Sequence, residues 1–219
     1  MSLTLYGAIL SPYVRKIRIQ LAEQMIAHEL VVQAPFNQPD WFFEISPLGR
    51  IPAIKDGDFT LADSAVIGQY LQDTRSGAPL YGETPEQAAR VRWLEKYADY
   101  ELGALATHGV FFNRVVKPVA GDSCDDAVVQ RSLEQLPPLF DYLEDQLGDK
   151  HYFLGELFSM ADIAVCSQLI NLAHAGELID ENRWPNLSSL LSRVTARSSV
   201  SSLLPDEHQM VARMRERTR

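Results

Sequence analysis

Cysteine is scarce in this sequence. The two cysteines among its 219 residues, Cys124 and Cys166, are far apart and form no C-x-x-C pair. A disulfide framework or a zinc site therefore has little support, and we expect no bound metal. Cys166 lies in an apolar stretch and is predicted to be a core residue. This use of cysteine fits a reducing compartment, so we expect a cytoplasmic protein.

Long hydrophobic runs and an excess of basic residues are also missing. No apolar run approaches the roughly 18 residues that a membrane span needs. The first residues show no basic segment followed by an apolar one, so a secretory signal is not expected. Twenty Lys and Arg stand against 29 Asp and Glu, which gives a net charge of −9. An acidic protein repels phosphate backbones, so we expect neither nucleic acid nor membrane as a partner.

The first third of the chain alternates strand and helix patterns. Residues 3–6 alternate apolar and polar side chains, as a strand does. Ser11 and Pro12 are typical of a helix N-cap and first helical position. The helix that follows presents one apolar face, formed by Val14, Ile17, Leu21 and Met25. A strand at residues 30–32 follows it, and it should be parallel to the first because a helix joins the two.

A hairpin and a further helix complete this part. Residues 51–55 and 58–61 flank Asp56-Gly57, which is a strong β-hairpin signal. A helix from about Ser64 to Leu71 comes next. The order is therefore β-α-β, then a hairpin, then α.

Only helical periodicity is visible after Pro85. One long helix should place Val91, Leu94, Ala98, Leu102 and Leu105 on a common face, and a second should do so with Val129, Leu133, Leu136, Phe140, Leu143 and Leu147. Pro137-Pro138 predicts a kink or a break in the second helix. Ser159 and Asp162 have capping-box spacing, with aspartate in place of the usual glutamate. The apolar helix after them is predicted to be the buried centre of a helical domain.

Five stretches, in order, carry a resemblance to a known family: 6–18, 46–54, 61–67, 158–163, and 184–187 together with 196–197. The second is similar to the family segment Asn-Pro-x-Gly-Lys-Val-Pro-x-Leu, whose proline is cis, and the third to Leu-x-Glu-Ser-x-x-Ile. The chain thus resembles the cytosolic glutathione transferases, in their serine-type and bacterial-like form, over nearly its whole length. Ser46, Arg50 and Ser198 depart from the family's usual asparagine, lysine and proline.

The resemblance implies a fold and a domain division. The fold class is an α/β thioredoxin-like N-terminal domain followed by an all-α C-terminal helical domain. We expect residues 1–77 to form the glutathione-binding domain and 78–85 the linker. Residues 86–219 would form the helical domain that contributes the acceptor pocket. The resemblance also implies a homodimer.

The chemistry of glutathione explains why the matched residues suit it. Ser64 would begin a helix, whose free N–H groups favour the γ-glutamyl carboxylate. Asp63 would face the ammonium group, and Arg50 the glycyl carboxylate. A cis peptide between Ile51 and Pro52 would expose the backbone of Ile51 to the cysteinyl part, as one strand adds to another.

Ser11 is the candidate catalytic residue, because its hydroxyl and the helix start could stabilise the thiolate. On local sequence alone, an N-cap is the better interpretation of Ser11. The family resemblance over the rest of the chain favours the catalytic interpretation instead. Asp63 and Ser64 could likewise be only a helix start. Tyr6, which stands where other classes place a catalytic tyrosine, is expected to pack. Tyr97, Tyr100 and His108 could border an acceptor pocket, and helix packing explains them equally well.

Three functions remain open, and a fourth is disfavoured by Ser11. The leading one is a glutathione S-transferase that activates the thiol for attack on a small hydrophobic electrophile, with glutathione as co-substrate and no other cofactor. A glutathione-dependent isomerase of the zeta type would carry a denser serine and cysteine cluster near Ser11, and an omega-type thiol transferase would carry cysteine there. A non-catalytic regulator of the same fold, resembling stringent starvation proteins, is disfavoured by the intact set of Arg50, Asp63 and Ser64. The sequence does not name the electrophile.

Overall fold

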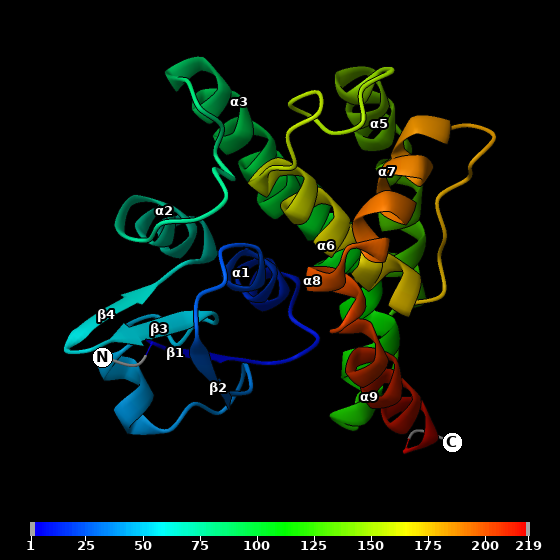
Figure 1. Cartoon of the computed structure of the whole chain (residues 1–219). Helices are drawn as coiled ribbons and strands as arrows, with labels where there is room; N and C mark the ends of the chain where they lie inside the picture. The colour runs from blue at the N-terminus through cyan, green and yellow to red at the C-terminus, as the bar shows by residue number, and fades with distance from the viewer. Residues whose placement is uncertain (1–2, 218–219) are drawn as a thin grey trace.

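The computed structural model describes residues 3–217, so the outer ends of both expected domains, residues 1–2 and 218–219, lie outside it. A mixed sheet at one side of the molecule faces a larger bundle of helices (Figure 1). The N-terminal elements are β1 (Leu3–Gly7), α1 (Pro12–Glu23), β2 (His28–Val32), η1 (Asp40–Glu44), β3 (Ala53–Asp56), β4 (Phe59–Ala62) and α2 (Ser64–Thr74). The helical elements are α3 (Pro85–Lys96), η2 (Tyr97–Leu102), η3 (Ala104–Val116), α4 (Lys117–Val119), α5 (Asp126–Leu147), α6 (Met160–His174), α7 (Pro185–Ala196), α8 (Ser198–Ser201) and α9 (Leu204–Glu216).

The sheet has the order β2-β1-β3-β4. β1 is parallel to β2 and antiparallel to β3, and β3 pairs with β4 as a hairpin. Gly57 turns that hairpin with a φ of 63°, a conformation that glycine adopts without steric cost. The expected parallel pair and the expected hairpin are both confirmed, and the class is a thioredoxin-like α/β domain with a helical domain after it.

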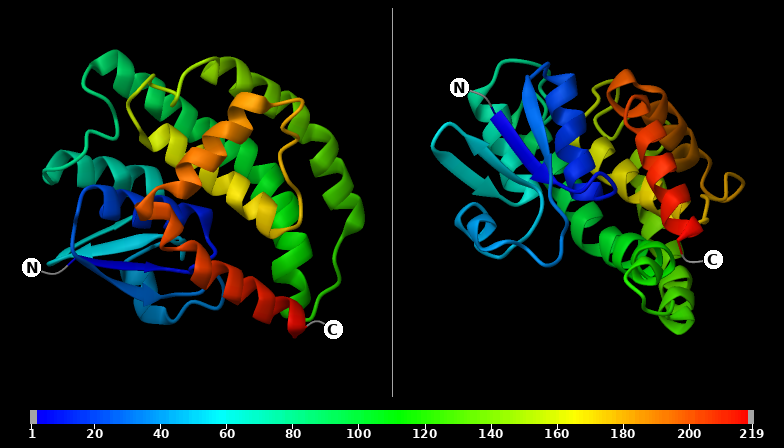
Figure 2. Two further views of the ribbon diagram at one scale, coloured as in Figure 1. Left: turned by 45° about the vertical axis from the view of Figure 1, so that its right-hand side comes forward. Right: turned by 90° about the horizontal axis from the view of Figure 1, so that it is seen from below.

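Helix α1 lies between the sheet and the helical domain, as both views in Figure 2 show. Its apolar face packs on the sheet with α2, in a cluster formed by Leu3, Leu5, Val14, Ile17, Leu21, Ile54, Ile67 and Leu71. Met25 was expected on this face, but it is 88% exposed. The helix ends at Glu23, and Met25 has a φ of 53° in the turn that follows, so the helical spacing no longer applies to it.

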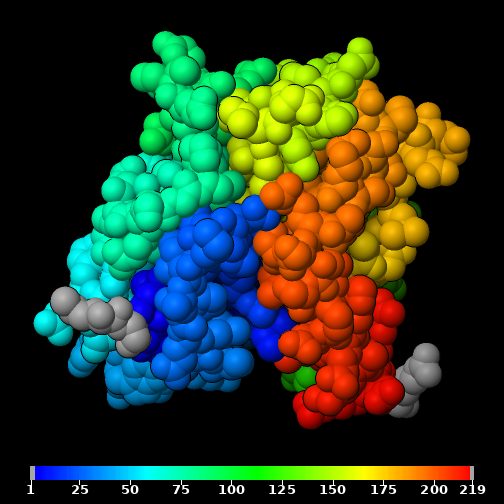
Figure 3. All heavy atoms as spheres, in the orientation of Figure 1, coloured from blue at the N-terminus to red at the C-terminus, as the bar shows by residue number. Residues whose placement is uncertain are grey.

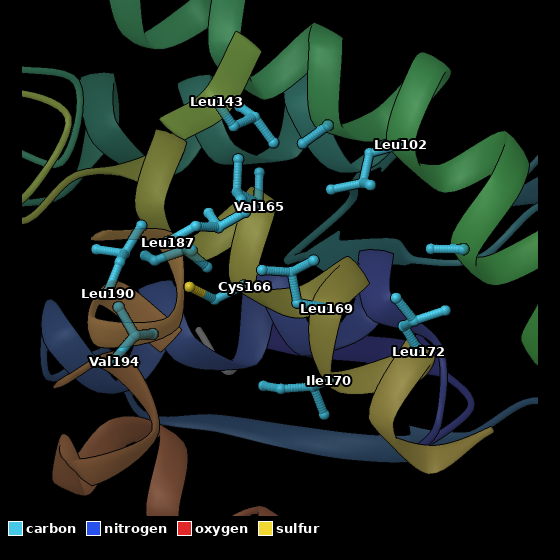
Figure 4. Close-up of a cluster of buried hydrophobic side chains, with 14 of the residues drawn as sticks. Leu102, Leu143, Val165, Cys166, Leu169, Ile170, Leu172, Leu187, Leu190 and Val194 are labelled. Atoms are coloured by element: carbon cyan, nitrogen blue, oxygen red, sulfur yellow. The ribbon is translucent and has the colours of Figure 1, made fainter. Parts of the chain in front are cut away.

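The helical domain is built around α6. All but one of the residues from Met160 to His174 are buried, and Cys166 is fully buried as expected. Figure 4 shows Leu187, Leu190 and Val194 of α7 facing Cys166 across this core. The predicted long helix after Pro85 forms as α3 and continues through the π-helical segments η2 and η3.

The two prolines of α5 do not break it. The helix runs continuously from Asp126 to Leu147 through Pro137 and Pro138, so the expected break is absent. Each proline removes one N–H donor and its ring crowds the preceding turn, which favours bending. The helix curves over its length in Figure 2. Leu136 and Phe140, buried on either side of the prolines, hold the two halves against the core.

A capping box begins α6, as predicted. The Asp162 carboxylate accepts hydrogen bonds from the Ser159 N–H (2.8 Å), the Ser159 hydroxyl (2.7 Å) and the Phe153 N–H (2.9 Å). Burial raises the pKa of Asp162 to about 6 in spite of these donors. This carboxylate therefore fixes both the start of the central helix and the loop before it.

Asp162→Ala should lower the free energy of unfolding by about 3 kcal/mol, because three buried donors lose their acceptor at once. Chemical denaturation followed by far-UV circular dichroism measures this. Asp125→Ala is the matched control, since Asp125 caps the exposed start of α5 through the single Val128 N–H. It should cost only about 1 kcal/mol. Equal losses in the two variants would contradict the structural role given to Asp162.

Candidate functional site

Strand register brings three separate segments to one edge of the sheet. Tyr6 pairs with Ala53, and Ala53 pairs with Ala62. The loop after β1, the turn before β3 and the residue after β4 therefore emerge side by side. They carry Ser11, Ile51-Pro52 and Asp63-Ser64, respectively. The structure thus brings the sequence-predicted residues to one place.

Ser11 is the N-cap of α1. Its side-chain oxygen accepts from the Val14 N–H at 3.4 Å, and its own carbonyl accepts from the Arg15 N–H at 2.9 Å. The serine is half-buried. Because the cap bond is long and uses only a lone pair, the hydroxyl proton remains available to a ligand at the helix start.

The Arg50 loop is closed by Ser46, which is fully buried. The Ser46 hydroxyl donates to the Arg50 carbonyl (2.8 Å) and accepts from the Arg50 N–H (3.0 Å). The Arg50 side chain is exposed, and the Ile51–Pro52 peptide that follows is cis, as expected. In the sequence, Ser46 stands out only as a departure from the family's usual asparagine. Its short side chain hydrogen-bonds to both the N–H and the carbonyl of Arg50. This role in closing the loop could not be inferred from the residue type alone.

Asp63 caps α2 in an unusual backbone conformation, with a φ of 78°. One of its carboxylate oxygens accepts from the Ala65 N–H (3.0 Å) and the Val66 N–H (3.2 Å). A positive φ is uncommon at residues other than glycine, although aspartate tolerates it better than most, and such conformations are enriched at functional sites. Asp63 is exposed and Ser64 buried beside it, so a charge and a helix start face the same space.

Two cations on α1 have a role that the sequence did not show. Arg15 and Lys16 are 0% and 1% exposed. The Lys16 ammonium contacts Glu95 (2.8 Å) and Asp99 (2.6 Å), and the Arg15 guanidinium contacts Glu207 (2.6 Å). Each pair joins the first domain to the helical one. A Lys or Arg on an isolated helix is usually solvated, so only the fold reveals these partners.

Aromatic side chains from both domains border the start of α1. The Tyr13 hydroxyl donates to the Asp99 carbonyl (3.1 Å) and lies 3.4 Å from the His108 ring nitrogen Nε2. Burial raises the pKa of Tyr13 to about 12, so its phenol stays protonated at neutral pH. Farther along η3, Phe112 meets Phe36 with ring centroids 5.9 Å apart.

The other two candidates for the acceptor border make different contacts. Tyr97 packs against Tyr142, with ring centroids 4.7 Å apart, and Tyr100 is 61% exposed with the Lys96 ammonium over its ring. Of the three residues considered, His108 is the one that contacts α1 through Tyr13. Across residues 3–217, no helix is long and apolar enough to cross a membrane.

The structure joins a thioredoxin-like domain, which has a cis-proline turn and a capped helix at one edge, to a largely helical domain. This architecture defines a fold class, and comparison with known proteins identifies the family within it. Residues 5–79 match the model of the glutathione S-transferase N-terminal domain, and residues 126–193 match that of the C-terminal domain. A glutathione S-transferase of Hyoscyamus muticus is 32% identical over 169 residues, which are 74% of this chain and 79% of that one. The chain belongs to the glutathione S-transferase family and is an enzyme of that family.

Relatives outside plants are similar over the full length. Human glutathione S-transferase theta-1 is 29% identical over 223 residues, 99% of this chain and 91% of its own. The solved structure of human glutathione-S-transferase T1-1 in its apo form has a TM-score of 0.86 at 27% identity, and covers 98% of this chain and 91% of its own. FzlA from C. crescentus also reaches a TM-score of 0.86, but at 19% identity it shows the fold alone.

Ser46→Ala should lower the free energy of unfolding by about 2 kcal/mol, because the change leaves the N–H and carbonyl of Arg50 without their buried partner. Denaturant titration measures the loss. Ser76→Ala, at an exposed loop serine, should change stability by less than about 0.5 kcal/mol. If the two variants unfold alike, Ser46 does not hold the loop.

Proposed function

We propose that this enzyme binds glutathione at the Ser11, Pro52 and Asp63 edge of the sheet and activates its thiol for attack on a small hydrophobic electrophile. The observation that carries the proposal is the strand register, which gathers a hydroxyl at a helix start, a cis-proline turn and a charged helix cap. No metal or further cofactor is part of this proposal. Glutathione has two carboxylates, an ammonium group and a thiol, and each of these needs a different kind of partner.

Each polar group of glutathione would have a partner. The start of α2 suits the γ-glutamyl carboxylate, because the Ser64 hydroxyl and N–H could donate to it and the helix dipole favours an anion. Asp63 uses one oxygen as the cap, and its second oxygen would face the ammonium group. The exposed Arg50 would pair with the glycyl carboxylate, and the backbone of Ile51 with the cysteinyl part.

Thiol activation would fall to Ser11. A free thiol has a pKa near 8.5, so about two units of lowering are needed for a useful thiolate fraction, or about 2.7 kcal/mol. One hydroxyl donor and the N-terminus of α1 together can supply this. The thiolate would then attack an electrophile held between α1 and η3. There Tyr13, His108 and the Phe36–Phe112 pair supply an aromatic border.

Several finer assignments remain proposals. They are the serine-type and bacterial-like subclass, the domain limits 1–77, 78–85 and 86–219, the homodimer and the cytoplasmic location. The zeta-type isomerase and the non-catalytic regulator stay as alternative functions. A turnover screen with glutathione against aryl halides, epoxides, enones and peroxides separates the transferase from the non-catalytic regulator, because a regulator would turn over none of these.

Ser11→Ala should raise the pKa of the bound thiol and slow conjugation about ten- to a hundredfold near neutral pH, because one charge-assisted hydrogen bond is worth roughly 1.5–3 kcal/mol. Glutathione affinity should change much less, since the carboxylate contacts remain. Thiolate absorbance of bound glutathione, titrated with pH, measures the first effect.

The control for lost capping is Thr84→Ala. Thr84 caps α3 through the Gln87 N–H at 3.2 Å, far along the chain from the site. Both variants should lose about 1 kcal/mol of stability, but only Ser11→Ala should move the thiol titration. An unmoved titration would make Ser11 a cap and leave the activating donor elsewhere, with Tyr6 or a backbone N–H of residues 7–13 as the next candidates.

Asp63→Asn should weaken glutathione binding about tenfold, because the amide can keep the cap bonds and tolerates a positive φ, but it removes the charge opposite the ammonium group. Isothermal calorimetry measures the affinity. Asp125→Asn, the same change at the cap of α5, should leave it unaltered. Equal affinity in wild type and Asp63→Asn would remove Asp63 from the binding site.

A further inference from the structure

The C-terminal helix α9 reaches the first domain through one buried carboxylate. Glu207 is 0% exposed. Its two oxygens accept from the Arg15 guanidinium, at 2.9 Å from Nε and 2.6 Å from the terminal nitrogen, and His174 of α6 lies 2.9 Å away through Nε2. Such a two-point contact fixes orientation as well as distance. Figure 3 shows N-terminal segments (blue) lying directly against the C-terminal helices (orange and red).

Arg15 connects this contact to the candidate catalytic serine. Its second terminal nitrogen donates to the Ser167 carbonyl of α6 at 2.7 Å, so the guanidinium is held by both α6 and α9. Its backbone N–H donates to the Ser11 carbonyl at 2.9 Å, which is the first helical hydrogen bond of α1. The path from α9 to Ser11 therefore consists of one ion pair, one side chain and one backbone bond.

The electrostatics favour a permanently charged pair. Burial alone would raise the pKa of Glu207, but the Arg15 charge and the bonds from His174 and Arg15 outweigh it and hold the pKa at about 2. A buried charge without its partner is strongly unfavourable, so the first turn of α1 cannot shift from α9 without breaking this contact.

We propose that Glu207 is a positioning residue for the chemistry at Ser11. Through Arg15 it fixes the first turn of α1 against the helical domain, and so sets where the Ser11 hydroxyl and the helix N-terminus point. This inference rests on the proposed role of Ser11 in activating the glutathione thiol. It gives the last helix of the chain a part in thiol activation, although α9 supplies no group to the thiol itself.

A second, less buried ion pair on the same helix offers a comparison. Glu23, at the far end of α1, accepts from two nitrogens of Arg197 at 2.9 and 2.8 Å, and Arg197 comes directly before α8. Both pairs join α1 to the C-terminal helices by a two-point contact. Glu23 is the last residue of α1 and is remote in the helix from Ser11, so its pair should support stability without affecting the thiol.

The experiment compares the double variants Arg15→Gln/Glu207→Gln and Glu23→Gln/Arg197→Gln with wild type. Changing both partners avoids leaving a buried charge unpaired. The third variant is Glu207→Asp, which keeps the charge but shortens the side chain. It tests the proposal if Arg15→Gln/Glu207→Gln does not fold. For each protein, denaturation gives stability, calorimetry gives glutathione affinity, and pH-dependent absorbance gives the pKa of the bound thiol.

Arg15→Gln/Glu207→Gln should raise the thiol pKa by about one unit and lower kcat about tenfold below that pKa, with KM for glutathione changed less than about threefold. Glu207→Asp should move the pKa in the same direction. Glu23→Gln/Arg197→Gln should lose stability and leave the pKa unchanged. A low wild-type thiol pKa that neither Glu207 variant moves would overturn this inference alone. A wild type that binds no glutathione would overturn the proposed function and this inference with it.

Discussion

The placement of α1 between the sheet and the helical domain is the constraint on which the rest of the structure depends. One face of the helix is apolar and packs on the sheet through Val14, Ile17 and Leu21. The opposite side carries Arg15 and Lys16, both buried and paired with carboxylates of the helical domain. Breaking either pair by removing one partner would leave a buried charge, so the two domains are held in one arrangement. These contacts therefore also fix the position of the start of α1, where Ser11 lies.

The sheet contributes the second half of the site by register alone. Because β3 is paired on both sides, the loop after β1 and the cap of α2 must emerge next to the Ile51–Pro52 turn. Pairing within the sheet brings these three segments together, and contacts with the helical domain fix the start of α1. From the helical domain, His108 lies near Tyr13 and Phe112 lies near Phe36. In the proposed reaction, glutathione would bind at the sheet edge and the electrophile would lie between α1 and η3. Helix α1 would therefore contact both substrates.

Local patterns predicted most of the fold, for physical reasons that particular residues make clear. Ser11-Pro12, Asp56-Gly57 and the Ser159–Asp162 box each encode a turn or cap within a few residues, and the structure contains all three. Contacts between distant segments could not be predicted in this way. The partners of Arg15 and Lys16 lie 192 and 79 residues away, respectively. Pro137-Pro138 predicted a kink or a break from local sterics, and α5 stays continuous with buried side chains on either side of the prolines.

The most direct test of the whole account is the ionisation of glutathione bound to the unaltered enzyme. The ultraviolet thiolate band should be titrated with pH in the presence of saturating enzyme, with free glutathione as the reference. The bound thiol should have a pKa about two units below the free value of about 8.5. Saturable binding with an unshifted pKa, or no binding at all, would contradict a site that gathers Ser11, Pro52 and Asp63 in order to activate that thiol.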